Sequence, residues 1–291
     1  MLGSFSMNEN KTVREVFLVV LSAVLMVSGC FPWKAPERPK VYASVSEALE
    51  SPEKARVLSL HASGLTAVPA GIDRLVNLQK WTLRGNDIGS LPPAIGALKE
   101  LQWLDAGKTG IVALPAEVSN LQKLTWLYLN DNGFTVFPEN ITSLHSLKYV
   151  NLDRNAISAL PSSAGKLENL KWLRLNHNKM SGLPEEIGDL TRLERLYVGW
   201  NNISRLPDSI ERLVNLTDLV LSGNRFDYFP EVIMKLPNLK RLDLDENRIS
   251  KLPENLAPLN GLEVLKIYGN KLSEDEINRI KKALPDCMVV F

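Results

Sequence analysis

A leucine recurs with a fixed 23-residue period over more than half of this sequence. The series runs from Leu78 to Leu262 and contains eight consecutive intervals of equal length, with no insertion or deletion. A fixed period of roughly 20–50 residues is typical of a solenoid, in which each repeat buries its apolar face only against its neighbours. The period therefore predicts a repetitive fold and favours a binding scaffold over an enzyme.

Within each repeat the apolar residues change their spacing. If Leu78 is position 1, apolar residues at positions 4 and 6 alternate with their neighbours, which is typical of a short strand. In the second half they stand three positions apart, as at Pro92, Ile95 and Leu98, which indicates a 3₁₀ or single-turn helix. We therefore expect parallel strands on one side of the solenoid and short turns on the other.

This spacing resembles the leucine-rich repeat in its 23-residue form. One copy shows the consensus clearly, with Leu193, Leu196, Val198, Asn201, Ile203, Leu206, Pro207, Ile210 and Leu213. The resemblance covers about residues 55–270, roughly ten copies. It implies an α/β fold of the leucine-rich-repeat solenoid type, with a curved parallel β-sheet on the concave face, short 3₁₀ or helical turns on the convex face, and caps at both ends.

Position 9 holds an asparagine in eight copies, namely Asn86, Asn132, Asn155, Asn178, Asn201, Asn224, Asn247 and Asn270. A buried amide is tolerated only when its donors and acceptor are paired. We therefore predict that these side chains bond the backbone of adjacent turns and have a structural role. Ser63 and Thr109 replace asparagine in two copies. A hydroxyl can make fewer such bonds, so we expect the solenoid to be weaker there.

The N-terminal segment, up to Cys30, predicts export. Lys11 and Arg14 precede an apolar stretch that runs from Val16 to Val27. A membrane-spanning helix needs about 20 residues, so this shorter stretch fits the apolar region of a signal peptide instead.

The last residue of this stretch and the three that follow, Val27-Ser28-Gly29-Cys30, resemble the lipobox of bacterial lipoproteins. The resemblance implies cleavage before Cys30 and acylation of its thiol, and several acyl chains would give stable membrane anchoring. A simple secretory peptide with an incidental cysteine is the alternative. Phe31 after the cysteine resembles an outer-membrane sorting context, so we expect a lipoprotein of the bacterial cell envelope, in the outer membrane or at the cell surface. Periplasmic and surface exposure both stay open.

The expected organisation has five parts. These are a signal peptide (1–29), a Pro-rich tether (30–40), an N-terminal cap (41–54), the repeats (55–272) and a C-terminal cap (273–291). Ser44 and Glu47 have the spacing of a capping box before a short helix. Ser273 caps a predicted helix that ends near Leu284. The last strand has two possible registers: the repeat period turns Met288 and Val290 inward, whereas Cys287, Val289 and Phe291 alternate equally well.

Several function classes are disfavoured. The formal charge is +1 and no basic block interrupts the sequence, so we expect no nucleic-acid partner. Two cysteines and three scattered histidines predict neither a disulfide framework nor a metal site. No grouping typical of nucleophilic or acid–base catalysis stands out, and we expect no enzyme activity and no cofactor.

Function is expected at the positions that the scaffold leaves free. Positions 3, 5, 7 and 8 should point away from the core on the concave face, and position 3 holds four aromatic residues in adjacent turns: Trp103, Trp126, Tyr149 and Trp172. Further aromatic and cationic residues fall nearby, namely Tyr128, Arg174, Arg195, Tyr197 and Trp200. These nine residues are the predicted partner-binding surface.

Two interpretations of this surface remain. The rings could do no more than pack on one another and stabilise a narrow sheet. Exposed aromatic patches, however, usually mark interaction sites, and Trp, Tyr and Arg dominate binding hot spots. We expect a protein partner because charged residues surround the rings, with a glycan stacked on the rings as the alternative. A separate acidic group, Asp218, Asp243, Asp245 and Glu246, is best explained by local ion pairs with Arg241 and Lys266.

Overall fold

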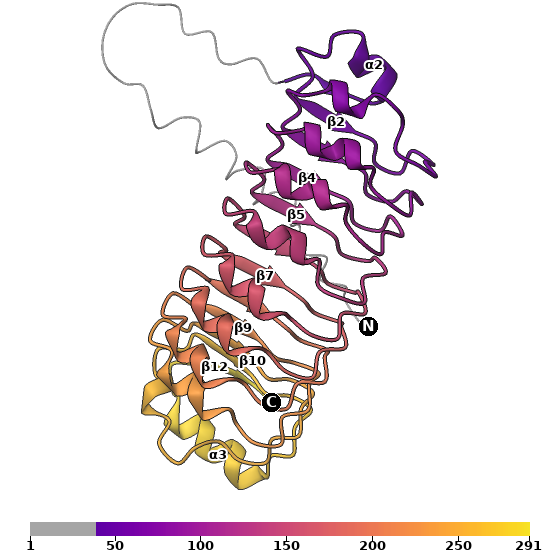
Figure 1. The fold of residues 1–291 in the computed structure, drawn as a ribbon. Helices are drawn as coiled ribbons and strands as arrows, with labels where there is room; N and C mark the ends of the chain where they lie inside the picture. The colour runs from indigo at the N-terminus through magenta and orange to yellow at the C-terminus, as the bar shows by residue number, and fades with distance from the viewer. Residues whose placement is uncertain (1–38) are drawn as a thin grey trace, which may run out of the picture. The chain divides into compact units, whose positions relative to one another are not determined.

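The computed structural model describes residues 39–291. These residues form one repetitive body whose strands lie side by side along its length (Figure 1). The expected signal sequence, the lipidation site Cys30 and nearly all of the tether lie outside the described residues.

The described residues contain a single open sheet of twelve short strands. The strands are β1 (Val41–Tyr42), β2 (Val57–Ser59), β3 (Lys80–Thr82), β4 (Trp103–Asp105), β5 (Trp126–Tyr128), β6 (Tyr149–Asn151), β7 (Trp172–Arg174), β8 (Arg195–Tyr197), β9 (Asp218–Val220), β10 (Arg241–Asp243), β11 (Val264–Lys266) and β12 (Met288–Val290). All neighbours pair in parallel, and their order in the sheet is their order in the chain.

The repeat period sets the register of the sheet. From β2 to β11 every paired residue lies one full period from its partner, as in Lys80 with Trp103 and Trp103 with Trp126. The central residue of each strand from β2 to β11 occupies position 4 and is buried, as Leu104 and Leu127 are. Because side chains alternate across a strand, positions 3 and 5 face away from the core.

Short 3₁₀ helices form the opposite side of the solenoid. They are η1 (Ile72–Arg74), η2 (Pro93–Ala97), η3 (Ala116–Asn120), η4 (Glu139–Ser143), η5 (Ser162–Lys166), η6 (Glu185–Asp189), η7 (Asp208–Arg212), η8 (Glu231–Lys235) and η9 (Ala257–Leu259). A proline with φ between −67° and −76° precedes each of η2 to η8. The ring of proline fixes this angle, so the repeated proline starts each turn with nearly the same φ.

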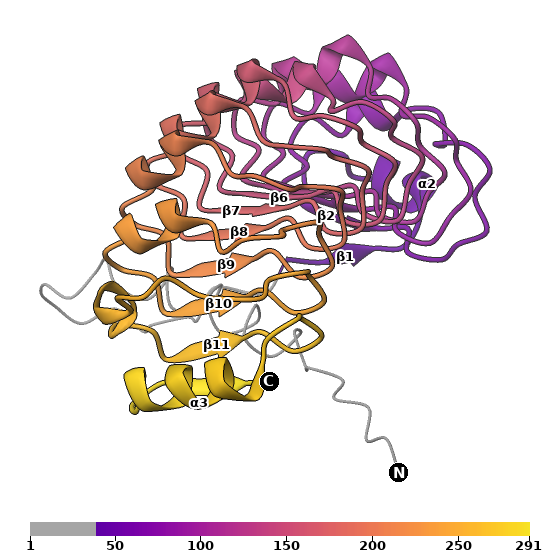
Figure 2. The same ribbon diagram turned by 90° about the horizontal axis from the view of Figure 1, so that it is seen from below.

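The strands lie on the concave face and the 3₁₀ helices on the convex face, as Figure 2 shows for β6 to β11 and the coils outside them. A helical turn is wider than an extended strand, so stacking many copies bends the solenoid toward its strands. Glycine lets some turns pack closely: a Cβ added at Gly188 in η6 would clash with the carbonyl oxygen of Ser209 in η7. The predicted fold is confirmed.

The asparagine column forms the predicted ladder. In Asn178, Nδ2 donates to the carbonyl oxygens of Leu152 and Leu175, both at 3.0 Å, and Oδ1 accepts from the backbone N–H of Ile157 at 3.0 Å. The first carbonyl and the N–H belong to the preceding turn. Each amide therefore joins two turns and satisfies backbone groups that neither strand nor turn can pair.

Thr109 makes fewer of these bonds. Its hydroxyl donates to the carbonyl oxygen of Ala106 in its own turn at 2.7 Å and lies 3.1 Å from Oδ1 of Asn132 in the next turn. No side-chain hydrogen bond of Thr109 reaches Leu83 or Ile88 in the preceding turn, among the bonds of the described residues. The contact that the ladder makes elsewhere is therefore missing at this junction.

Helices cap both ends of the repeats. Ser44 accepts a hydrogen bond from the N–H of Glu47 and so begins α2 (Val45–Leu49), while the Glu47 carboxylate accepts from the N–H of Ala43. Ser273 begins α3 (Glu274–Ala283) by accepting from the N–H of Glu276. Both N-caps satisfy helix N–H groups that would otherwise lack a partner.

The last strand adopts the second of the two predicted registers. Val264 pairs with Met288, which lies one position further along the chain than the repeat period would place its partner. Met288 is 65% exposed, whereas Cys287, Val289 and Phe291 pack against the core. The extra residue shifts the register by one position, and such a shift moves every side chain of a strand to the other face of the sheet. Cys287, Val289 and Phe291 therefore face the core.

Candidate functional site

Six aromatic side chains form a continuous surface across β4 to β8, here called the aromatic strip. Its members are Trp103, Trp126, Tyr128, Tyr149, Trp172 and Tyr197. The strand register brings them together, because positions 3 and 5 of adjacent strands are direct neighbours. These residues were predicted to gather on the concave face, and they lie in contact there.

Every ring of the aromatic strip touches another. Ring centroids are 5.5 Å apart for Trp103 and Trp126, and 5.3 Å apart for Trp126 and Tyr149. Tyr128 bridges the two columns, at 4.9 Å from Trp103 and 4.7 Å from Tyr149. Trp172 meets Tyr149 and Tyr197 edge-on, at 5.0 Å and 5.6 Å. These are favourable geometries for aromatic pairs, worth about 0.5–1.5 kcal/mol each beyond their buried area.

Cationic side chains lie over both ends of the aromatic strip. Lys80 Nζ is 4.5 Å from the Trp103 ring, and the Arg195 guanidinium is 4.6 Å from the Trp172 ring. Arg174 lies within 5.8 Å of Trp172 and 5.6 Å of Tyr197. These distances allow cation–π attraction. Burial among these groups lowers the pKa of Lys80 and raises the pKa of Tyr197.

The rings are only partly accessible. Tyr149 is buried at 4% exposure, whereas the other five members of the strip are partly buried. Mutual packing of the rings therefore accounts for part of this burial. The part of the strip that solvent can reach consists of the exposed portions of the rings and the cations that lie over them.

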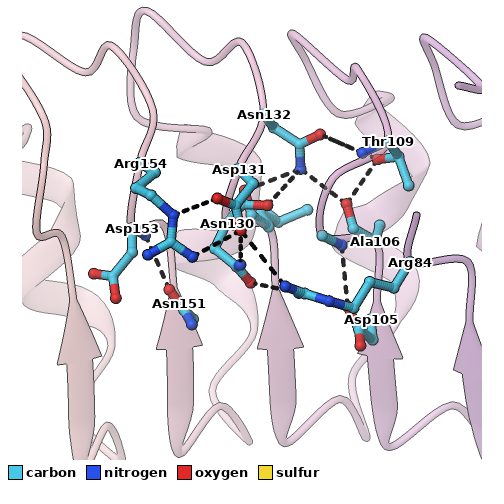
Figure 3. Close-up of polar contacts among 12 residues, drawn as sticks. Arg84, Asp105, Ala106, Thr109, Asn130, Asp131, Asn132, Asn151, Asp153 and Arg154 are labelled. Carbon is cyan, nitrogen blue, oxygen red and sulfur yellow. Dashed lines mark hydrogen bonds and ion pairs between the residues drawn. The ribbon is translucent and has the colours of Figure 1, made fainter. Parts of the chain in front are cut away.

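Charged residues lie at the ends of neighbouring strands and in the loops that follow them (Figure 3). Arg84 lies 3.5 Å from the Asp131 carboxylate and 3.9 Å from that of Asp105. Arg154 binds the same Asp131 through two nitrogens, with Nη2 at 2.9 Å from Oδ2. The Arg154 guanidinium lowers the pKa of Asp131, whereas burial raises the pKa of Asp105.

The ion pairs of the concave face share one arrangement. Their carboxylates, from Asp105, Asp131, Asp153, Asp218 and Asp243, are 2–25% exposed, whereas the paired cations are 20–59% exposed. Elsewhere on the described residues, apart from the capping pair Glu276–Arg279, the paired acids are 35–77% exposed. Short aspartates lie beneath long arginines and lysines, so a partner would meet positive charge first.

Two buried carboxylates hold the arginines of the predicted site. Arg174 Nε donates to Asp153 at 2.7 Å, and Asp153 also accepts from the N–H of Asn176. Asp218 lies 3.8 Å from Arg195 and 3.1 Å from Arg241. Of the acidic group, Asp218 pairs with Arg241 and Asp243 pairs with Lys266 at 3.8 Å, whereas no ion pair within residues 39–291 involves Asp245 or Glu246. No cluster of three metal-ligating side chains occurs within residues 39–291.

Trp200 lies apart from the aromatic strip. Its ring stacks on His177 at 5.5 Å with an interplanar angle of 7°, and it also contacts Gly223, where an added Cβ would lie 2.5 Å from the indole. All three residues occupy position 8. Of the nine residues predicted to bind a partner, Trp200 is the one that makes no ring or cation–π contact with the strip among the described contacts.

The backbone explains this separation, which the sequence did not reveal. All ten residues at position 8, from Ala62 to Gly269, have positive φ angles between 48° and 78°. L-residues rarely adopt this conformation, and each one costs about 1–2 kcal/mol. Position 8 forms its own column, in which neighbours such as Asp131 and Arg154 contact each other. In the sequence, only the glycines at Gly85, Gly223 and Gly269 indicate a positive φ at position 8, because the other copies hold other residues there.

Sequence comparison identifies the family. A profile described as "Leucine-rich repeat region" matches residues 42–148 and 138–224, and a profile described as "Leucine Rich Repeat" matches residues 238–259. The chain belongs to the leucine-rich repeat family. A search among curated proteins gave no significant match.

Solved structures show the same fold. An internalin (inlF) from Listeria monocytogenes is 21% identical, with 83% of this chain and 82% of that chain covered and a TM-score of 0.61. The plant peptide hormone receptor RGFR1, in complex with RGF2, is 24% identical, with coverages of 86% and 41% and a TM-score of 0.68. The Arabidopsis thaliana receptor kinase ectodomain GASSHO1/SCHENGEN3, in complex with CASPARIAN STRIP INTEGRITY FACTOR 2, is 24% identical, with coverages of 77% and 31% and a TM-score of 0.60. The chain spans less than half of either plant receptor.

Proposed function

We propose that this leucine-rich repeat protein binds another protein through its concave face, with the aromatic strip as the centre of the contact. The observation that carries the proposal is the continuity of the rings over five adjacent strands, with cations over both ends. Trp, Tyr and Arg at the centre of a surface are the residues that most often dominate binding energy. The described plant receptors are bound to partners in their structures, which agrees with this use of the fold.

The charges beside the rings suggest what the partner presents. The concave cations are more exposed than the carboxylates beneath them, at 42% for Arg195 against 8% for Asp218. A complementary surface would therefore carry acidic groups next to an apolar segment. Catalysis is not part of the proposal, because the ionisable groups of the strip are held in ion pairs and ring contacts.

Substitutions in the aromatic strip test the proposal. Trp126→Ala and Trp172→Ala each remove a ring at the centre of the contact, and we expect either to abolish capture of the partner in a cross-linked pull-down from whole cells. Tyr228→Ala is the matched control, because Tyr228 is 84% exposed and lies outside the strip. Trp126→Phe keeps a ring in place and should retain binding. Circular dichroism on each variant checks that the repeats remain folded.

Arginine variants refine the same test. Arg195→Gln leaves Asp218 paired with Arg241, so the variant should stay folded and lose affinity. Arg174 is a poorer probe, because its removal would leave the buried Asp153 carboxylate without its cation. If both tryptophan variants captured every partner as well as the wild-type protein, the aromatic strip would not be the contact surface.

A glycan is the second candidate for the same strip, because ring faces can stack on sugars. A glycan array probed with the wild-type protein and with Trp126→Ala separates the two possibilities. Retention on one glycan class that depends on Trp126 would replace the protein partner with a saccharide. Retention that survives the substitution would not involve the strip.

We also propose that the protein is exported and anchored to a membrane by lipid on Cys30. No helix within residues 39–291 is long and apolar enough to cross a bilayer. Metabolic labelling with an alkyne-tagged fatty acid tests the anchor, and the sequence supplies a matched control because it has two cysteines. Labelling should disappear in Cys30→Ala and persist in Cys287→Ala. Labelling of Cys30→Ala at the level of the wild-type protein would show that Cys30 is not the acylation site.

The proposed location is the outer membrane or the cell surface. Proteinase treatment of intact cells separates the two faces of the membrane. Digestion of the repeats in intact cells would place them outside, and protection until the cells are broken would place them in the periplasm.

A further inference from the structure

Four basic residues line one edge of the solenoid in its C-terminal half. Lys179, Arg225, Arg248 and Lys271 all occupy position 10, directly after the asparagine ladder. We call them the basic row. In the sequence each lies at least one full repeat from the next, so no basic block is visible there.

Backbone hydrogen bonds hold the basic row in register. The N–H of Arg225 donates to the carbonyl oxygen of Ile203 at 2.8 Å, and the N–H of Arg248 donates to Phe226 at 2.9 Å. Lys271 repeats the bond with Ile249 at 2.8 Å, and Lys179 repeats it with Ile157 at 2.8 Å. Each residue at position 10 is thereby fixed next to the preceding turn, roughly 5 Å away.

The four side chains are exposed and lack acidic partners. Positions 9 and 11 are buried around Lys179, Arg225 and Arg248 and partly buried around Lys271, so position 10 faces solvent. No ion pair within residues 39–291 involves any member of the basic row. Their charges are therefore available to a ligand, unlike those of Arg174, Arg195 and Arg241.

The charge is confined to one half of this edge. In the N-terminal half, position 10 is occupied by Gly64, Asp87, Gly110, Gly133 and Ala156, none of them basic. In the C-terminal half, exposed Arg205 at position 13 adds to the four cations, and the exposed acids nearest to them along the chain are Asp227, Glu246 and Glu274. A net charge of +1 for the whole sequence conceals this segregation.

The surroundings favour a linear polyanion over a folded protein. Protein interfaces usually have an apolar centre, whereas position 12 beside the basic row holds Ser181, Ser204, Ser250 and Ser273, and Asp227 in the turn of Arg225. Hydroxyl and amide groups between cations suit a ligand rich in hydroxyl groups. A straight polymer with regularly repeated carboxylates can meet successive cations along the solenoid axis.

We propose that the basic row binds a linear acidic polysaccharide whose carboxylates pair with Arg225, Arg248, Lys271 and Lys179. The site is separate from the aromatic strip, because position 10 lies beyond the asparagine ladder and not on the strands. It therefore does not depend on the proposed function of the concave face.

Charge-neutral variants test the proposal with polygalacturonate as the probe. The triple variant R225Q/R248Q/K271Q should bind immobilised polygalacturonate at least roughly tenfold more weakly than the wild-type protein, which corresponds to about 1.4 kcal/mol. The control K99Q/K166Q/K282Q removes the same number of exposed, unpaired charges from other surfaces and should bind normally. Wild-type binding should weaken as salt rises, because exposed charges are screened. Equal loss in both triple variants, or no binding by the wild-type protein, would overturn the proposal.

A gain of binding provides the opposite test. Asn202 occupies the gap in the basic row between Lys179 and Arg225, and the N–H of Asn202 makes the same backbone bond, to Met180 at 2.8 Å. Asn202→Lys should therefore tighten binding to polygalacturonate, and unchanged binding would count against the row. Neutral dextran should not bind. If poly-L-glutamate bound as tightly as polygalacturonate, the row would recognise charge alone and the assignment to a polysaccharide would be wrong.

Discussion

Replacing Asn201 with alanine tests the central structural argument, that the asparagine column joins each turn to the one before it. Asn201 is 7% exposed. Its Oδ1 accepts from the N–H of Met180 at 3.0 Å, and its Nδ2 donates to the carbonyl oxygens of Leu175 and Val198, both at 3.0 Å. Alanine removes these three bonds at once, together with a longer contact of 3.1 Å from Nδ2 to the carbonyl oxygen of Gly199.

The three bonds do not contribute equally. The carbonyls of Leu175 and Val198 keep a second donor, from Asn178 and Asn224 respectively, so each loses one of two bonds. The N–H of Met180 loses its side-chain acceptor in a buried position. Leaving a buried donor unpaired costs about 1–3 kcal/mol, and each weakened carbonyl adds about 0.5–1 kcal/mol. We therefore expect Asn201→Ala to lower the free energy of unfolding by about 3–4 kcal/mol.

Urea and thermal unfolding followed by circular dichroism measure this loss, which corresponds to roughly 10 °C in the melting temperature. The adjacent Asn202 supplies the control. Its side chain makes one long contact, 3.5 Å to the carbonyl oxygen of Lys179, so Asn202→Ala should change stability by less than about 0.5 kcal/mol. If Asn201→Ala cost no more than Asn202→Ala, the ladder would not be what couples adjacent turns.

Three other substitutions should change the stability of the protein, two by raising it and one by lowering it. Thr109→Asn should stabilise the protein by about 1 kcal/mol, because an amide there can reach the preceding turn as the other asparagines do. Gly188→Ala should destabilise it by about 1–3 kcal/mol in urea unfolding, because the new Cβ would press on η7. Asp105→Asn should stabilise the protein at pH 7, because burial raises the pKa of Asp105 and so disfavours its charged form. This gain should vanish below about pH 4, where the carboxyl is protonated in both the folded and unfolded states.

Each of these expectations has a definite counter-result. A loss of stability in Thr109→Asn would mean that the hydroxyl, and not the amide, suits that junction. Gly182→Ala is the control for Gly188→Ala, since no atom lies within 4 Å of its added Cβ; equal losses would exclude close packing as the cause. A stabilisation by Asp105→Asn that persists unchanged at pH 3 would exclude the carboxylate charge as its cause.

The repeat period was enough to predict the fold, because strand register follows directly from it. The constant period brings position 3 of one turn beside position 3 of the next, as Trp103 lies beside Trp126. The contacts of the aromatic strip could be predicted for the same reason. The register of the last strand could not be predicted, because two alternations of apolar residues were equally good. One extra residue decides between them, and it is seen only in the pairing of Val264 with Met288.

The sequence by itself determined which positions build the scaffold, because burial and hydrogen bonding repeat with the period. Tertiary structure decided what the remaining positions do. The positive φ at position 8 directs Trp200 away from the strip. Arginine and lysine side chains are longer than those of aspartate, so the cations of the concave face lie above the buried carboxylates. Stacking of the turns made a row of Lys179, Arg225, Arg248 and Lys271, which are scattered along the chain. These features depend on contacts between turns and on backbone angles, neither of which a linear pattern of residues contains.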